Sequence, residues 1–191
     1  MSSQGPQIGE ISSDGLFRWD GQEWSPLARP HREPTSWTTP MRVAAAAYLV
    51  LGAAWSIATT ALFLNADALV RVTRANNPAV PPDQLQNTAN LGVTLGWAVV
   101  IATSIIMLVL ALGSFQGWRW AFWAVLVWLG LTSVGVATNA VALANPRAQA
   151  QPPGAIAVGL VFSLVALALL AWFVAAAVRY GPWGVRRTAA G

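Results

Sequence analysis

Few side chains in this chain of 191 residues could perform acid–base, nucleophilic or metal chemistry. The chain has no cysteine, no lysine and one histidine, His31, which lies in a proline-rich stretch. Since a metal site needs several such ligands together, His31 is interpreted as a solvated linker residue. Asp67 and Asp83 could approach each other, but helix termini and an ion pair from Asp67 to Arg71 account for them. We therefore expect no enzymatic activity, no metal and no cofactor.

A stripe of hydroxyl and amide side chains lies within residues 121–144, a long apolar stretch without charges. Its members are Thr132, Ser133, Thr138 and Asn139. Such a stripe can line a water path or form hydrogen bonds between helices, and the second use is the commoner one. Asn139 matters most, because its own helix cannot satisfy its side-chain amide. Groups that would indicate proton or ion coupling, such as intramembrane carboxylates, are missing from every apolar stretch.

Small residues recur at helical spacing in three of the apolar stretches. Gly92 and Gly96 form a GxxxG step, and similar ladders occur elsewhere, at Gly52, Ser56 and Thr60 and at Ala155, Gly159 and Ser163. Such ladders let helix backbones approach closely in lipid. Packing within one compact bundle is favoured over a dedicated dimer face.

The polar N-terminal segment contains one organised motif, within residues 11–27. Asp20-Gly21 lies between short aromatic runs, which is a strong signal for a two-residue type I′ hairpin turn. That turn predicts three cross-strand pairs: Trp19 with Gln22, Arg18 with Glu23 and Phe17 with Trp24. Alternation then puts Phe17, Trp19 and Trp24 on one face. Because an isolated hairpin is marginal in water, we expect the aromatic face to rest on something.

This motif resembles a short tryptophan-rich module of actinobacterial membrane proteins, written roughly as DG-x-x-x-W-DG-x-x-W. The residues that carry the resemblance are Asp14, Gly15, Trp19, Asp20, Gly21 and Trp24. The likeness covers about a tenth of the chain, and the module has no assigned chemistry to carry over. The resemblance implies an actinobacterial source and a cytoplasmic location for this segment. In its overall pattern the chain also looks like small actinobacterial proteins with four membrane spans.

Four stretches are uncharged and long enough to cross the roughly 30 Å apolar core of a bilayer. They are residues 43–64, 91–113, 121–144 and 155–178. The second and third cannot be one helix, because 91–144 would be about 80 Å long at 1.5 Å per residue. The chain must therefore turn back at residues 114–120, where Arg119 is the only charge.

The predicted fold class is all-α, a four-helix transmembrane bundle with a short N-terminal β-hairpin and a disordered linker. Residues 1–41 form a polar tail that ends in a proline-rich linker, 42–180 the four-span domain and 181–191 a second tail. Between the first two spans, a helical pattern continues over 65–74, ends at Asn76-Asn77-Pro78 and resumes at Pro81-Pro82.

Arginines near the span ends predict the orientation, because cytoplasmic loops carry the excess of basic residues. The side of the two tails and of the turn has seven: Arg29, Arg32, Arg42, Arg119, Arg179, Arg186 and Arg187. The opposite side has three, Arg71, Arg74 and Arg147. Trp118, Trp120, Trp123 and Trp183 lie where interfacial aromatics are expected. Both termini are therefore predicted to be cytoplasmic, in a protein of the bacterial plasma membrane.

The leading functional hypothesis is a non-catalytic membrane scaffold or adaptor, because an organised aromatic motif is tethered to spans that lack reactive groups. Its partners would be the lipid bilayer and other membrane or cytoplasmic proteins. The alternative is a small transporter or channel subunit, acting as an oligomer, with a path along Thr138 and Asn139. Both hypotheses allow a homo-oligomer. Nucleic acid is not expected, because the arginines flank apolar stretches.

Overall fold

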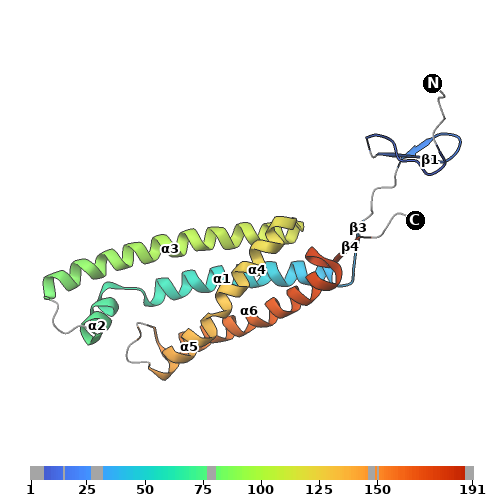
Figure 1. Cartoon of the computed structure of the whole chain (residues 1–191). Coiled ribbons are helices and arrows are strands. Elements are labelled where there is room, and N and C mark those ends of the chain that lie inside the picture. Colours follow the sequence, from blue (N-terminus) through green and yellow to red (C-terminus); the bar gives the residue numbers. More distant parts are fainter. Residues whose placement is uncertain are drawn as a thin grey trace.

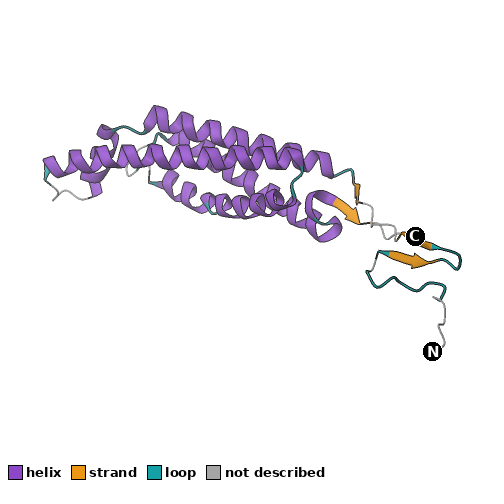
Figure 2. Cartoon of the chain, turned by 90° about the horizontal axis from the view of Figure 1, so that it is seen from above, coloured by secondary structure: helices purple, strands orange, loops and turns teal. Residues whose placement is uncertain are grey.

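The computed structural model describes residues 7–14, 16–26, 32–76, 81–145, 149 and 151–187. Long helices run side by side, and short β-strands lie beyond one end of them (Figures 1 and 2). Gly15, Arg29, His31 and Arg147, which entered the sequence-based predictions, lie outside the described residues. The same holds for residues 27–31 of the linker and for the side chains of Arg32, Asp83, Arg186 and Arg187.

Four helical stretches in the described part are long and apolar enough to cross a membrane. They contain the four predicted spans almost completely and comprise α1 (Thr38–Phe63), α3 (Pro82–Gln116), α4 (Arg119–Ser133) continued by α5 (Gly135–Ala144), and α6 (Pro153–Tyr180). Prolines mark two of the helix starts, since Pro82 and Pro153 occupy first-turn positions where their missing N–H has no partner to lose. The mostly helical fold is therefore confirmed.

The predicted helical extension after the first span is α2 (Ala66–Asn76), which packs on the beginning of α3. The Asn65 side chain caps the N-terminus of α2, because its Oδ1 accepts the N–H of Ala68 at 2.8 Å. Figure 1 shows α2 at the end of the helices opposite to the strands.

The third apolar stretch is interrupted at Val134, between α4 and α5. The hydroxyls of Thr132 and Ser133 bond back to the carbonyls of Trp128 and Leu129 at 2.8 and 2.7 Å. Such bonds compete with the helical ladder and often bend helices. Gly135 follows directly, so a local break at this place has an identifiable cause.

The buried core joins α1, α3, α4 and α6 near the end where the strands lie. It contains residues from every one of these helices, chiefly Met41, Leu49, Met107, Phe122, Val125, Leu129, Phe173 and Ala176. Two aromatic pairs connect α4 with α6 and with the C-terminal segment: Phe122 stacks on Phe173, and the edge of Trp183 meets Phe122. The side chains that point away from this core are also apolar, as at Leu91, Ile105, Val127 and Val178.

The predicted hairpin exists, as β1 (Phe17–Trp19) and β2 (Trp24–Pro26), but its predicted register is wrong. The observed pairs are Trp19 with Trp24, Arg18 with Ser25 and Phe17 with Pro26. The loop therefore has four residues instead of two. The cause is the Asp20 carboxylate, whose Oδ1 accepts the backbone N–H groups of both Gln22 and Glu23 at 2.8 Å. This Asx-type turn places the two tryptophans opposite each other across the strands.

A second sheet was not predicted. β3 (Arg32–Pro34) pairs antiparallel with β4 (Val185–Arg187), so the end of the predicted linker is a strand that meets the C-terminal segment. Between α6 and β4 the chain makes a turn of 3₁₀ helix, η2 (Pro182–Gly184). The segments that lead into α1 and out of α6 thus lie together at one end of the helices.

Candidate functional site

The N-terminal hairpin carries the predicted interaction residues Phe17, Trp19, Asp20, Gly21 and Trp24. The structure brings the aromatic members together: the rings of Trp19 and Trp24 meet edge to face, with centroids 5.5 Å apart. Gly21 has φ of +107°, a conformation that L side chains rarely adopt, and so allows the loop. The predicted Arg18–Glu23 pair across the strands is replaced by Arg18 opposite Ser25.

The hairpin is supported by the residues that precede it. The N–H of Gly9 donates to the carbonyl of Trp19, and the N–H of Trp19 donates to the carbonyl of Glu10, both at 2.8 Å. The preceding segment thus covers the free edge of β1, and three neighbouring segments form a more stable unit than two strands alone. In Figures 1 and 2 this unit lies beyond the end of the helices and separate from them. The rings of Trp19 and Trp24 pack on each other within this unit.

One side of the hairpin is hollowed. A hollow of about 510 Å³ is lined by Glu10, Ile11, Ser12, Ser13, Phe17 and Trp24. Trp24 is 39% exposed there, which is high for a tryptophan in an ordered strand. The hollow thus offers an aromatic floor with a carboxylate at its side.

Two carboxylates hold the turns of this unit. The pKa of Asp20 is lowered from its ordinary value of 3.8, because the N–H groups of Glu23 and Gln22 and the hydroxyl of Ser25 donate to its carboxylate. The pKa of Asp14 is lowered in the same way, first by the Ser12 hydroxyl and then by the N–H of Leu16. The ionised form of both side chains is therefore part of the folded hairpin.

The polar stripe of the third span divides between two directions. Thr138 is exposed and bonds to the carbonyl of Gly135 in its own helix. Asn139 faces α6, where its Nδ2 donates to the Ser163 hydroxyl at 3.3 Å, and that hydroxyl donates to the carbonyl of Gly159. Methyl groups at Gly135 or Gly159 would crowd Ser163 or Asn139. The small residues thus let α5 and α6 approach, and Asn139 bonds across the contact.

Gly92 and Gly96 serve contacts within the chain. A Cβ on Gly96 would lie 2.6 Å from a methyl of Leu64, and one on Gly92 would lie 3.0 Å from a methyl of Leu69. Leu64 directly follows the end of α1, and Leu69 belongs to α2. The ladder therefore accommodates the folded-back connection between the first two long helices.

The predicted topology anchors occupy different environments. Trp118, Arg119 and Trp120 are exposed around the start of α4, and Arg179 is exposed in the last turn of α6. Trp183, in contrast, is 1% exposed and lies in the core, so its predicted interfacial placement is wrong. Its indole N–H donates to the carbonyl of Trp118 at 2.8 Å. Burial of a tryptophan with its one donor satisfied explains why it does not lie at the surface.

Gly184 joins the segment before α1 to the segment after α6. Its carbonyl accepts the hydroxyls of Thr35 at 2.6 Å and of Thr38 at 3.1 Å, just before and within the first turn of α1. It has φ of +63°, and a Cβ there would lie 3.2 Å from the Thr35 hydroxyl and 3.3 Å from Cβ of Trp37. The junction of these two segments therefore depends on hydrogen bonds that form only because the backbone at Gly184 lies close to Thr35 and Thr38.

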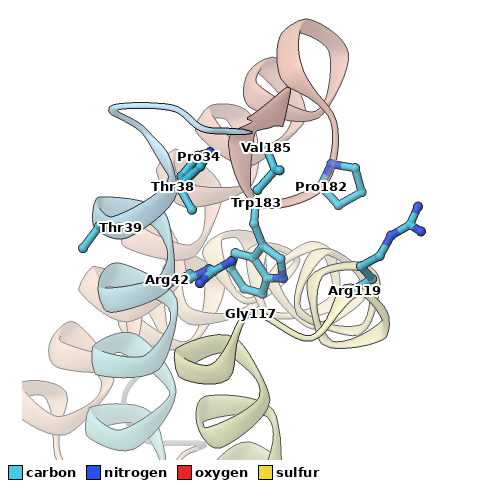
Figure 3. Close-up of a pocket in the computed structure, with 9 residues that line it drawn as sticks. All are labelled: Pro34, Thr38, Thr39, Arg42, Gly117, Arg119, Pro182, Trp183 and Val185. Carbon is cyan, nitrogen blue, oxygen red and sulfur yellow. The ribbon is translucent and has the colours of Figure 1, made fainter. Parts of the chain in front are cut away.

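A cavity of about 390 Å³ lies beside this junction. It is lined by residues from the start of α1, the α3–α4 turn and the C-terminal segment: Pro34, Thr38, Thr39, Arg42, Gly117, Arg119, Pro182, Trp183 and Val185. Figure 3 shows Arg42 reaching toward Gly117 and the Trp183 ring, with Arg119 on the other side of that ring. Sequence reasoning named Arg42 and Arg119 as separate anchors and missed that they line one cavity.

Comparisons of the chain with protein-family models, with curated proteins and with solved structures found no match. The resemblance of the hairpin to a tryptophan-rich module therefore stays a prediction.

Proposed function

We propose that this protein is a non-catalytic membrane adaptor. Four membrane-spanning segments would hold the N-terminal hairpin at the cytoplasmic surface, where its aromatic hollow binds another protein. The observation that carries the proposal is the hairpin itself. It has its own hydrogen-bonded turns and covered edge, lies apart from the helices and leaves an aromatic hollow open.

Residence in a membrane is supported by the outer surface of the helices. Large apolar side chains are half-exposed or more along all four long helical stretches, as at Leu51, Ile106, Leu131 and Val161. A surface of this kind is unfavourable in water, where contiguous apolar patches are small. The arginine distribution of seven against three supports a cytoplasmic location for the end where β3 and β4 meet.

The charge of the hairpin indicates what it would bind. Residues 7–26 carry four carboxylates and one arginine, whereas the rest of the chain is strongly basic. An acidic unit is repelled by the anionic inner leaflet, so its hollow stays available to proteins. An aromatic floor beside Glu10 fits a peptide segment with an exposed apolar side chain next to a lysine or arginine.

The alternative of a transporter or channel subunit has less support. The hydroxyls of Thr132, Ser133 and Thr138 bond to carbonyls of their own helices, and Asn139 bonds to α6. Cysteines placed at positions 132, 135 and 139 test this alternative directly. Labelling of all three by a water-soluble maleimide would favour a water path over the packing contact.

The adaptor proposal is tested by site-specific cross-linking in native membranes. A photoreactive amino acid at Gln22, exposed in the hairpin loop, is expected to capture a discrete set of proteins. Trp24→Ala should remove these products, because it takes away the floor of the hollow, whereas Trp123→Ala, an exposed tryptophan on α4, should not. A variant lacking residues 1–31 that still co-purifies with every captured partner would overturn the proposal.

A further inference from the structure

The cavity beside the junction of the segments before α1 and after α6 has the size of a small-ligand pocket and a cationic lining. Its volume of about 390 Å³ lies within the range of roughly 300–1,000 Å³ that is typical of ligand pockets. The described lining includes two arginines and no carboxylate. The nearest acid along the chain, Glu33, lies opposite Arg186 in the β3–β4 ladder and outside this lining.

Arg42 has an unused hydrogen-bond donor inside the cavity wall. Its Nε is buried and has no hydrogen-bond partner among the described residues. A buried donor without a partner costs free energy, more so when it belongs to a charged group. This N–H lies against Gly117 and is not accessible to a bound anion, but the same guanidinium carries further N–H donors in a planar fork that matches phosphate oxygens. An anion bound to those donors would compensate the charge of this partly buried side chain.

The guanidinium of Arg42 is held in place by backbone. Gly117 has φ of +73° and ends α3, and any Cβ there would overlap the guanidinium. The N–H of Trp118 donates to the carbonyl of Gly113, and the N–H of Gly117 donates to the carbonyl of Ser114. These two hydrogen bonds are the pattern of a Schellman cap. A rigid turn therefore positions Arg42, so that this side chain loses little conformational entropy when a ligand binds.

The rest of the wall adds polar groups to the two arginines. The cavity lies at the first turn of α1 and of α4, where helix dipoles are positive, and also beside the ends of α3 and α6, where they are negative, so the arginines supply the attraction for an anion. The Thr38 hydroxyl is engaged with Gly184, but Thr39 is exposed at the cavity. Arg119 is exposed beside Trp118 and Trp120, whose rings are also exposed.

We propose that this cavity binds a phosphate-type anion, held chiefly by Arg42, with Arg119 as the second arginine of the lining. Two sources share this chemistry: the headgroup of an anionic phospholipid and free phosphate. The exposed tryptophans beside Arg119 suit a site at headgroup level. The inference does not depend on the protein partner proposed for the hairpin.

The test uses the full chain in a neutral detergent and three probes: phosphatidylglycerol, phosphatidylcholine and inorganic phosphate. Binding is followed by native mass spectrometry and by the shift of the unfolding temperature. Phosphatidylglycerol should bind more tightly than phosphatidylcholine. Arg42→Gln and Arg119→Gln should each weaken binding about tenfold, whereas Arg179→Gln, an exposed arginine outside the cavity, should not.

The outcomes separate the two sources. Inorganic phosphate that stabilises the protein and displaces phosphatidylglycerol identifies the phosphate group as sufficient, whereas binding of phosphatidylglycerol alone identifies the lipid. Should Arg42→Gln fail to fold, Arg119→Gln keeps the test decisive, because Arg119 is exposed. Three results would overturn the proposal. The Arg119 variant could bind as tightly as the wild type, the Arg179 variant could lose as much binding as the cavity variants, or neither anionic probe could bind.

Discussion

Gly117 is the residue at which the turn and the first helix meet. Replacing it with alanine forces a Cβ into left-handed backbone, which costs roughly 1–2 kcal/mol, and also displaces the Arg42 guanidinium. We therefore expect Gly117→Ala to lower the free energy of unfolding by about 1–2 kcal/mol or more, measured by denaturant titration in mixed micelles. Gly130→Ala is the control. It lies within α4 with open space around it, so it should be neutral or stabilise by roughly 0.5–1 kcal/mol.

A double-mutant cycle divides the cost at Gly117 into its two parts. In the Arg42→Ala background the overlap is gone and only the backbone strain remains. Gly117→Ala should therefore cost less there than in the wild-type chain. An equal cost in both backgrounds would show that Arg42 does not press on this turn.

Asp20 makes the hairpin sensitive to acid. Its pKa is lowered by hydrogen bonds that only the folded loop supplies. The ionised carboxylate therefore stabilises the loop fully at pH values above the ordinary pKa of 3.8. This contribution is lost as the pH falls through the lower pKa of the folded state. The amide resonances of Gln22 and Glu23 should accordingly shift toward unfolded values in that acid range.

Asp20→Asn and Asp14→Asn form a matched pair for this measurement. Asp20→Asn should remove the pH dependence at Gln22, which has no carboxyl of its own, because asparagine does not titrate. Asp14→Asn should preserve it, because Asp14 bonds to Ser12 and Leu16 instead. An acid shift at Gln22 that persists in Asp20→Asn would contradict this assignment.

At the scale of elements, α5 and α6 are joined by one hydrogen bond between side chains. The cycle of Asn139→Ala and Ser163→Ala should give a coupling of roughly 0.6 kcal/mol, and at most about 1.7 kcal/mol, as for other bonds between membrane helices. Unfolding in mixed micelles measures it. Thr138→Ala is the control, since Thr138 is exposed and bonds to its own helix. Strictly additive costs at Asn139 and Ser163 would contradict the bond.

The long helices could be predicted from sequence, and the small sheets only in part. Twenty or more uncharged apolar residues predict a spanning helix by length alone, and α2 followed from periodicity. The hairpin turn was recognised at Asp20-Gly21, but its register depends on which N–H groups the Asp20 carboxylate accepts. β3 and β4 have three residues each and lie far apart in sequence, so no local pattern announces their pairing.

The candidate sites follow the same division. Aromatic alternation predicted that Phe17, Trp19 and Trp24 share a face, because that follows from strand geometry. The cavity of Arg42 and Arg119 could not be predicted, because it depends on how Gly117 and Trp183 fold against α1. Trp183 itself looked interfacial from its neighbours, yet its buried indole bonds to the α3–α4 turn.

For the whole molecule, the proposed adaptor function requires that the hairpin, the β3–β4 sheet and the α3–α4 turn lie on the cytoplasmic side. The natural absence of cysteine allows this to be tested without background. Single cysteines at three exposed positions report on the two sides: Ser36 before α1, Gln116 at the turn and Gln149 before α6. They are labelled in whole cells with a maleimide that does not cross the membrane.

The orientation of the protein in the membrane is measured most directly by labelling these cysteines before and after the membrane is made permeable. We expect Gln149→Cys to react in intact cells, whereas Ser36→Cys and Gln116→Cys should react only after permeabilisation. Labelling of Ser36→Cys in intact cells, with Gln149→Cys protected, would reverse the orientation and contradict the adaptor account.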